Sequence, residues 1–224
     1  MNYNFEHITQ SSWLGDLYNK YLPDSGFFVE IGMGHTTTPE SRQSNFTKLE
    51  LHGSNTIELL SLNWNGIFIE PVTEFCYEAI LLLKDKLDKI KIINTGASDI
   101  YEICTMYGEE TMIPNDIVPY KDYATGENYN YPGKKVLCKP TSVILSEVNC
   151  PKQIDLMSID VEGYEDKTLK GIDFNLHYPT MLIIESTRIN NDMIKDIIPE
   201  TYELIQHDNL NSCWVCDKTK TQEN

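Results

Sequence analysis

Several carboxylates follow apolar segments in the second half of the chain, at a spacing that suits chemistry. Asp160, Glu162 and Glu165 lie within six positions directly after one apolar segment, and Glu185 ends another. Burying such groups together is costly unless a cation or hydrogen-bond donors compensate their charge. These carboxylates suit a general base or the ligands of a hard divalent cation such as Mg²⁺ or Mn²⁺, and the sequence leaves both open.

Two glycines and a further carboxylate mark the ends of two earlier apolar segments. Gly32 and Gly34 follow residues 27–31, where glycine permits a tight turn and the close approach of a ligand. Glu70, followed by Pro71, ends the next apolar segment. An acidic residue at that place accepts hydrogen bonds from a ribose diol in dinucleotide-binding folds. The alternatives are a turn without a ligand for the glycines and a solvated strand end for Glu70.

The elements that must position these residues alternate between strands and helices. We expect strands at 27–31, 66–70, 90–94, 154–159 and 181–185, and helices at 10–22, 56–63, 73–87 and 165–170. Ser11 or Ser12 would cap the first helix. This alternation predicts a parallel α/β sheet with helices on both faces, and residues 202–207 and 212–216 would add an antiparallel hairpin at one edge. Ligands bind beyond the carboxyl ends of such strands, where the carboxylates and glycines lie.

Two polar stretches, 35–53 and 105–135, interrupt this rhythm. Structureless connections of this length are uncommon in compact domains unless they are functional. We expect both at the open end of the sheet, with 105–135 as an acceptor lid whose tyrosines either stack on sugar faces or pack on one another. His35 begins the first stretch and is another candidate base, with a surface loop histidine as the alternative.

Composition and charge limit the classes of partner. The 224 residues are 41% hydrophobic, which suits a single domain over 1–224. The 18 basic and 34 acidic residues give a net charge of −16, which repels nucleic acids and anionic membrane surfaces. No apolar run is long enough to span a bilayer, and residues 1–10 lack the features of a signal peptide.

The six cysteines are scattered in the way usual for a reduced, cytoplasmic protein. Cys213 and Cys216 resemble a redox or zinc pair. Positions three apart on a strand point to opposite faces, however, so we expect two buried structural thiols.

Five strings together resemble the FkbM-type S-adenosylmethionine-dependent methyltransferases, over most of the chain from Phe27 to Cys216. The strings are Phe27–Gly34, Ser54-Asn55-Thr56, Asn63–Pro71, Ile154–Glu165 and Leu169-Lys170-Gly171. The resemblance implies a class I methyltransferase (Rossmann-like) fold, with a seven-stranded mixed, mostly parallel sheet and helices on both faces. It also implies methyl transfer to oxygen, most often a sugar hydroxyl of a glycan or glycoconjugate. The string Met33-Gly34-His35 departs from the short acidic string of many members.

The resemblance also implies roles for particular residues. The cofactor S-adenosylmethionine would be bound by Glu30, Gly32, Gly34, Asn55, Glu70, Pro71, Ser98, Asp99 and Asp160, with Glu70 on the ribose and Ser98 and Asp99 near the adenine. The small residues at 94–99 would leave room for the base, or form a plain turn. The catalytic candidates are Asp160, Glu185 and His35, and the candidate ligands of Mg²⁺ or Mn²⁺ are Asp160, Glu162 and Glu185.

Other functions remain as alternatives. One is a non-catalytic scaffold that binds the nucleotide cofactor, and another is a methyltransferase acting on a small non-sugar acceptor. An NAD-dependent oxidoreductase is disfavoured because Thr37 stands where the third glycine of Gly-x-Gly-x-x-Gly is required.

Overall fold

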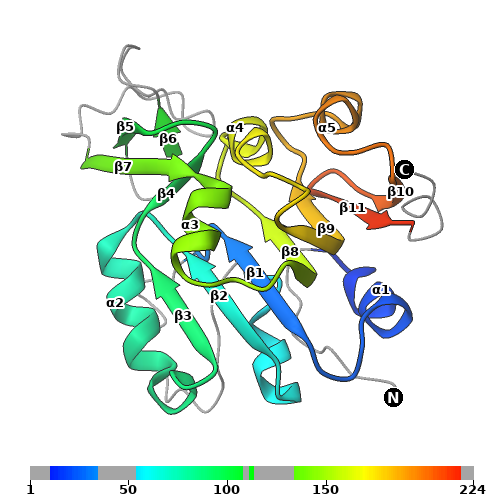
Figure 1. The fold of residues 1–224 in the computed structure, drawn as a ribbon, viewed down its shortest axis with the longest axis horizontal. Coiled ribbons are helices and arrows are strands. Elements are labelled where there is room, and N and C mark those ends of the chain that lie inside the picture. Colours follow the sequence, from blue (N-terminus) through cyan, green and yellow to red (C-terminus); the bar gives the residue numbers. More distant parts are fainter. Residues whose placement is uncertain (1–10, 35–53, 108–110, 114–133, 218–224) are drawn as a thin grey trace.

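The main sheet has seven strands in the order β10-β11-β9-β8-β1-β2-β3 (Figure 1). The computed structural model describes residues 11–34, 54–107, 111–113 and 134–217. The strands are β1 (Phe27–Ile31), β2 (Asn65–Ile69), β3 (Ile90–Ile93), β8 (Gln153–Ile159), β9 (Tyr178–Glu185), β10 (Tyr202–His207) and β11 (Asn211–Cys216). Six run in the same direction, whereas β11 runs antiparallel to its neighbours β9 and β10. This confirms the predicted mixed, mostly parallel sheet and its edge hairpin.

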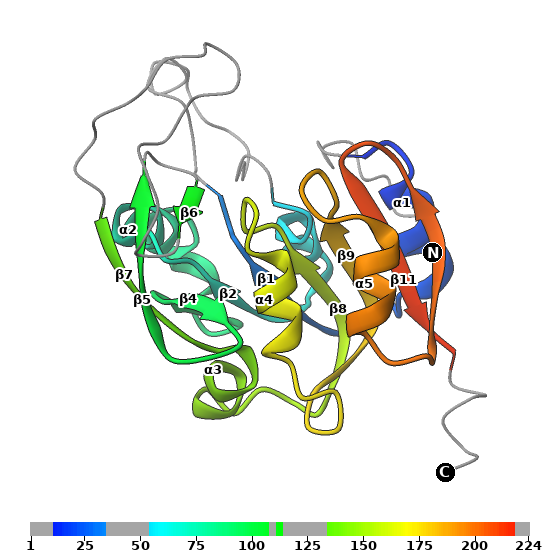
Figure 2. The same ribbon diagram turned by 90° about the horizontal axis from the view of Figure 1, so that it is seen from above.

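Helices cover both faces of this sheet, and each face has its own hydrophobic core (Figure 2). One face packs against α1 (Leu14–Tyr21), a 3-10 helix (Ile57–Leu62) and α2 (Thr73–Leu82), which continues into a 3-10 turn (Lys84–Lys86). The other packs against α3 (Thr141–Glu147), α4 (Glu165–Lys170) and α5 (Asn191–Ile197). Among the described residues, no helix has the length and apolar character needed to cross a bilayer.

Strand β1 lies at the centre of the sheet between β2 and β8, which explains its nearly continuous apolar sequence. Phe28 is fully buried and its ring meets that of Phe68 edge-on, at 5.2 Å between centroids. The ring also lies over Gly66, where an added Cβ would come within 2.3 Å of it. The close packing of β1 on β2 therefore requires a glycine there.

A second, smaller sheet excludes the alternative of a plain turn at 94–99 and gives regular structure to part of the polar stretch 105–135. It contains β4 (Gly96–Ser98), β5 (Glu102–Tyr107), β6 (Thr111–Ile113) and β7 (Lys134–Pro140), in the order β4-β7-β5-β6. Val136 and Cys138 face the core, whereas Leu137 is 53% exposed. Apolar residues on both faces hide the period-two pattern by which such strands are predicted.

Two further expectations need correction. Helix α1 is shorter than predicted and neither Ser11 nor Ser12 caps it, because its cap position is Trp13 and the Ser11 hydroxyl donates instead to Asp208, at 2.7 Å. The predicted helix over 73–87 ends at Leu82.

The expectation for the cysteine pair is confirmed. Cys213 and Cys216 are buried in the cores on opposite faces of the sheet. No disulfide joins the six cysteines, all of which lie in the described parts of the chain.

Candidate functional site

The glycine turn after β1 lies directly against the end of β8. The Gly32 amide donates to the Ile69 carbonyl, and the Asp160 amide donates to the Ile31 carbonyl, both at 2.9 Å. Gly32 has a φ of +84°, and a Cβ there would lie 1.5 Å from the carbonyl oxygen of Asp160. Only glycine fits this position, so the turn leaves backbone, and no side chain, beside Asp160.

Glu70 closes the other side of the glycine turn. Its buried carboxylate accepts hydrogen bonds from the Met33 amide at 3.2 Å and the Val72 amide at 2.8 Å. Burial raises the pKa of Glu70 to about 7, against the opposing effect of these amides. Its oxygens keep lone pairs for further donors, so this carboxylate can also accept hydroxyl groups of a ribose. The Asn94 side chain donates to the carbonyls of Glu70 and Pro71, at 3.0 Å each, and steadies the turn.

Glu30 lies inside β1 and faces a segment that comes much later in the sequence. Its carboxylate accepts hydrogen bonds from the Ser54 hydroxyl at 2.6 Å, the Asn55 amide at 2.7 Å and the Thr56 hydroxyl at 2.8 Å. Burial raises the pKa of Glu30 to about 7, while the three donors oppose this. The sequence interpretation missed Ser54 and Thr56; the available signal was an acidic residue within an otherwise apolar strand.

Asn55 connects this segment to β8. Its side-chain nitrogen donates to the Ser158 hydroxyl at 3.1 Å, two residues before Asp160. Asn55 is buried beside the ends of β1 and β8, next to the glycine turn and the carboxylates that follow β8.

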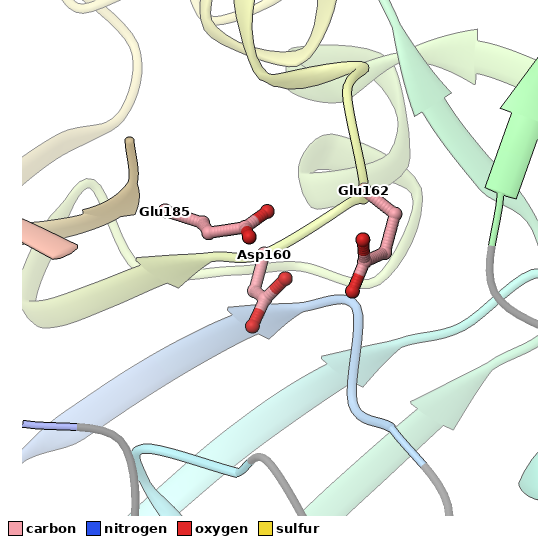
Figure 3. Close-up of side chains that lie close together, drawn as sticks. All are labelled: Asp160, Glu162 and Glu185. Atoms are coloured by element: carbon pink, nitrogen blue, oxygen red, sulfur yellow. The ribbon is translucent and has the colours of Figure 1, made fainter. Parts of the chain in front are cut away.

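Asp160, Glu162 and Glu185 form an acidic cluster beyond β8 and β9 (Figure 3). One oxygen of each lies within 4.8 Å of the others, and all three side chains are partly buried. Glu185 accepts a hydrogen bond from the Thr187 hydroxyl at 2.6 Å, and its other oxygen has no hydrogen-bond partner within the described residues. This spacing would allow the cluster to bind a divalent cation, or to take up a proton.

Arg188 offsets part of the charge of this acidic cluster. Its guanidinium lies 3.3 Å from the Glu162 carboxylate and also donates to the Glu162 carbonyl. Ionised carboxylates at this separation repel by on the order of 3 kcal/mol per pair at an effective dielectric of about 20, and by less where water screens them. Three ionised carboxylates and one guanidinium leave a net charge of −2, which favours a cation at the cluster.

Glu165 holds the turn that carries Glu162. Its buried carboxylate accepts from the Gly163 amide at 2.9 Å and the Val161 amide at 3.3 Å. Burial raises the pKa of Glu165, and the charge of Glu185 adds to this rise. Glu165 therefore shapes the turn and stays apart from the acidic cluster.

The remaining predicted site residues lie elsewhere or outside the described residues. Ser98 is on β4 of the small sheet, and its hydroxyl bonds with Glu102 at 2.6 Å and Asp99 at 3.2 Å. A role for Ser98 and Asp99 at the adenine stays a prediction. His35 and residues 35–53 lie outside the described residues, as does most of the predicted lid. Tyr101, which precedes the lid, is 61% exposed.

The described site thus combines a glycine turn, a buried carboxylate beside it and an acidic cluster, along the ends of four neighbouring strands, β2, β1, β8 and β9. A ligand that lies across these ends would meet backbone at Gly32, a hydrogen-bond acceptor at Glu70 and proton acceptors at Asp160 and Glu185. This arrangement suits a nucleoside-containing cofactor and a proton-losing acceptor side by side.

Comparisons with known proteins identify the family. No curated protein matches the chain. Among solved structures, a candidate methyltransferase of Escherichia coli, yhhF, aligns with a TM-score of 0.47 at 10% identity, over 94% of this chain and 90% of that one. The model of the methyltransferase FkbM domain matches residues 50–211, well over half of the sequence. The seven-stranded sheet with its antiparallel β11 is that of a class I methyltransferase, and the chain belongs to the FkbM methyltransferase family.

Proposed function

We propose that this methyltransferase uses S-adenosylmethionine to methylate a sugar hydroxyl of a glycan or glycoconjugate. The observation that carries the proposal is the meeting of the glycine turn and Glu70 with Asp160 and Glu185 at one end of the sheet. The first pair suits the nucleoside part of the cofactor, and the second suits an acceptor that must lose a proton.

The reaction is an in-line displacement in which different residues orient the cofactor and accept the proton of the acceptor. Bound S-adenosylmethionine supplies a methyl group on a positively charged sulfur, and the sulfur leaves as a neutral thioether. Glu70 orients the ribose, and the acidic cluster favours the positive charge. Asp160, next to the glycine turn, or Glu185 accepts the proton that the acceptor hydroxyl loses as its oxygen bonds to the methyl carbon. The net negative charge of the cluster favours a neutral acceptor over a phosphorylated one.

The same acidic cluster offers a second route to activating the hydroxyl. Mg²⁺ or Mn²⁺ held by Asp160, Glu162 and Glu185 would lower the pKa of a bound hydroxyl group. Chelation distinguishes the two routes. Methyl transfer that persists in excess EDTA supports a carboxylate as the proton acceptor. Methyl transfer that is lost in EDTA and recovered on addition of Mg²⁺ or Mn²⁺ supports the metal.

Cofactor binding is tested first, by calorimetric titration with S-adenosylhomocysteine and, separately, with NAD. We expect binding of S-adenosylhomocysteine, no binding of NAD, and an affinity about 10- to 100-fold lower for Glu70→Ala, since hydrogen bonds to charged groups contribute about 1.5–3 kcal/mol. Failure of the intact chain to bind S-adenosylhomocysteine would contradict the proposal, and a preference for NAD would favour an oxidoreductase.

Turnover is tested with labelled S-adenosylmethionine, a panel of glycans and a panel of small hydroxylated acceptors. We expect label in glycans, and we expect Asp160→Asn to slow transfer by about 10²- to 10⁴-fold while S-adenosylhomocysteine still binds. Asp166→Asn is the matched control, because Asp166 is paired with Lys170 on the exposed side of α4. Label only in small acceptors would overturn the glycan assignment, and cofactor binding without any transfer would favour a scaffold.

A cytoplasmic location and a partner other than nucleic acid or membrane belong to the same proposal. They are supported by the scattered cysteines, which form no disulfide, and by the net charge of −16.

A further inference from the structure

We propose that Glu30 is a positioning residue that holds residues 54–56 against the cofactor site and does not itself touch the cofactor. This inference rests on the proposed function, because it assigns Glu30 a part in binding S-adenosylmethionine. The structural element consists of Glu30, Ser54, Asn55 and Thr56, and we call it the Glu30 clamp.

The carboxylate of Glu30 is engaged entirely within the protein. Oε2 accepts from the hydroxyls of Ser54 and Thr56, and Oε1 accepts from the Asn55 amide, all at 2.6–2.8 Å. Glu30 is 1% exposed, and its three partners are also buried. Three hydrogen bonds of 2.6–2.8 Å to one carboxyl group hold the segment in place.

The segment has further anchors that fix its direction. The Tyr18 hydroxyl of α1 donates to the Asn55 carbonyl at 2.7 Å, and the Asn55 side chain reaches Ser158. The Ser54 hydroxyl also accepts from the Ile57 amide at 3.1 Å, which begins the following 3-10 helix. Residues 54–56 are thus bonded to β1 through Glu30 and to β8 through Ser158.

The clamp lies next to both halves of the site. Glu30 pairs in register with Ser158 on β8, and each stands two residues before a site residue, Gly32 and Asp160 respectively. Residues 54–56 therefore lie close to both the glycine turn and Asp160, beside the place where the amino-acid part of the cofactor would lie. Glutamine at this position would offer one acceptor oxygen where the carboxyl group offers two, so the Asn55 amide and the hydroxyls of Ser54 and Thr56 could not all keep their acceptor and the segment could move.

The clamp is tested first without any ligand, by hydrogen exchange. Glu30→Gln removes the charge and keeps the size of the side chain. We expect the amides of residues 55 and 57 to exchange at least 10-fold faster in Glu30→Gln, while the amides of α5 keep their protection. Unchanged exchange at residue 55 would overturn the inference, whatever the protein binds.

The second test measures S-adenosylhomocysteine affinity in a double-mutant cycle of Glu30→Gln with Thr56→Val. Thr56→Val removes the hydroxyl at nearly constant shape, and Thr56→Ser retains it as the matched control. We expect each of the first two variants to bind about 5- to 30-fold more weakly and the double variant no more weakly than the worse of them, because both release the same segment. Thr56→Ser should bind within about 2-fold of the intact protein.

Steady-state kinetics distinguish positioning from chemistry. Glu30→Gln should raise KM for S-adenosylmethionine and change kcat by less than about 2-fold. Losses that multiply in the double variant would mean that Glu30 contacts the cofactor directly, and this would overturn the inference. If the intact chain bound no S-adenosylhomocysteine, the proposed function would fail, and the exchange experiment would still decide whether Glu30 holds the segment.

Discussion

The buried carboxylate of Glu30 should make the stability of the folded protein depend on pH in an unusual direction. Burial raises its pKa from an ordinary value of 4.5 to about 7, so the folded chain keeps a proton that the unfolded chain has lost between these values. A group whose pKa is raised by folding contributes stability at low pH, and this contribution disappears as the pH rises through about 7. Substituting Glu30 by Gln should remove this dependence.

The size of the effect follows from the two pKa values. Between 4.5 and about 7, each pH unit lowers the free energy of unfolding by about 1.4 kcal/mol for this group, or about 3 kcal/mol in total. Glu70 adds a similar decrease, because burial also raises its pKa to about 7. The intact protein should therefore lose about 3 kcal/mol more stability over this interval than Glu30→Gln does.

The assay is urea unfolding followed by circular dichroism at several pH values from 5 to 8. The control is Glu200→Gln, at an exposed position after α5, which should keep the full pH dependence. An identical pH dependence in the intact protein and Glu30→Gln would refute the reasoning, since Glu30 would then be ionised in both states throughout. The same substitution should weaken cofactor binding.

Three further predictions concern other parts of the molecule. Gly32→Ala should abolish binding of S-adenosylhomocysteine in calorimetry and lower the melting temperature, because its Cβ would lie 1.5 Å from the Asp160 carbonyl oxygen; normal binding would contradict the geometry of the turn. Asn190→Ala should reduce the free energy of unfolding by about 1 kcal/mol, since the Asn190 side chain caps α5 through the Met193 amide, and cofactor affinity should stay unchanged. Cys213 should resist alkylation by iodoacetamide in the native protein and react after denaturation, as mass spectrometry would show, because burial raises its pKa to about 12.

The strands of the main sheet could be predicted because burial on both faces demands long apolar runs. Residues 27–31 and 154–159 show this, and the structure places β1 and β8 there with shifts of at most one residue. The small sheet could not be predicted in the same way. Its strand β4 has three residues, and the exposed side chains of Ile103 and Leu137 conceal which face is buried.

The acidic cluster could be anticipated from position alone, because the ends of neighbouring parallel strands meet at one edge of a sheet. Asp160 and Glu185 are 25 residues apart in the chain and come together through the pairing of β8 with β9. The Glu30 clamp could not be anticipated, since its partners lie 24 to 26 residues away across a polar stretch. The pairing of Arg188 with Glu162 depends likewise on the turn after β8, where Glu162 adopts a left-handed conformation with a φ of +53°.

The position of β11 has a consequence for how the protein is made. In the main sheet β10 pairs with β11 and β11 pairs with β9, so β11, which follows β10 in the chain, lies inside the sheet and β10 lies at its edge. A nascent chain that has just emerged through residue 207 has β10 but no neighbour for it, and Glu185 still lacks Asn211, its partner across the strand pair. The hairpin also brings Asp208 within hydrogen-bond distance of Ser11 and Trp13, which precede α1. The edge of the site beside Glu185 can therefore be completed only after translation has passed residue 211.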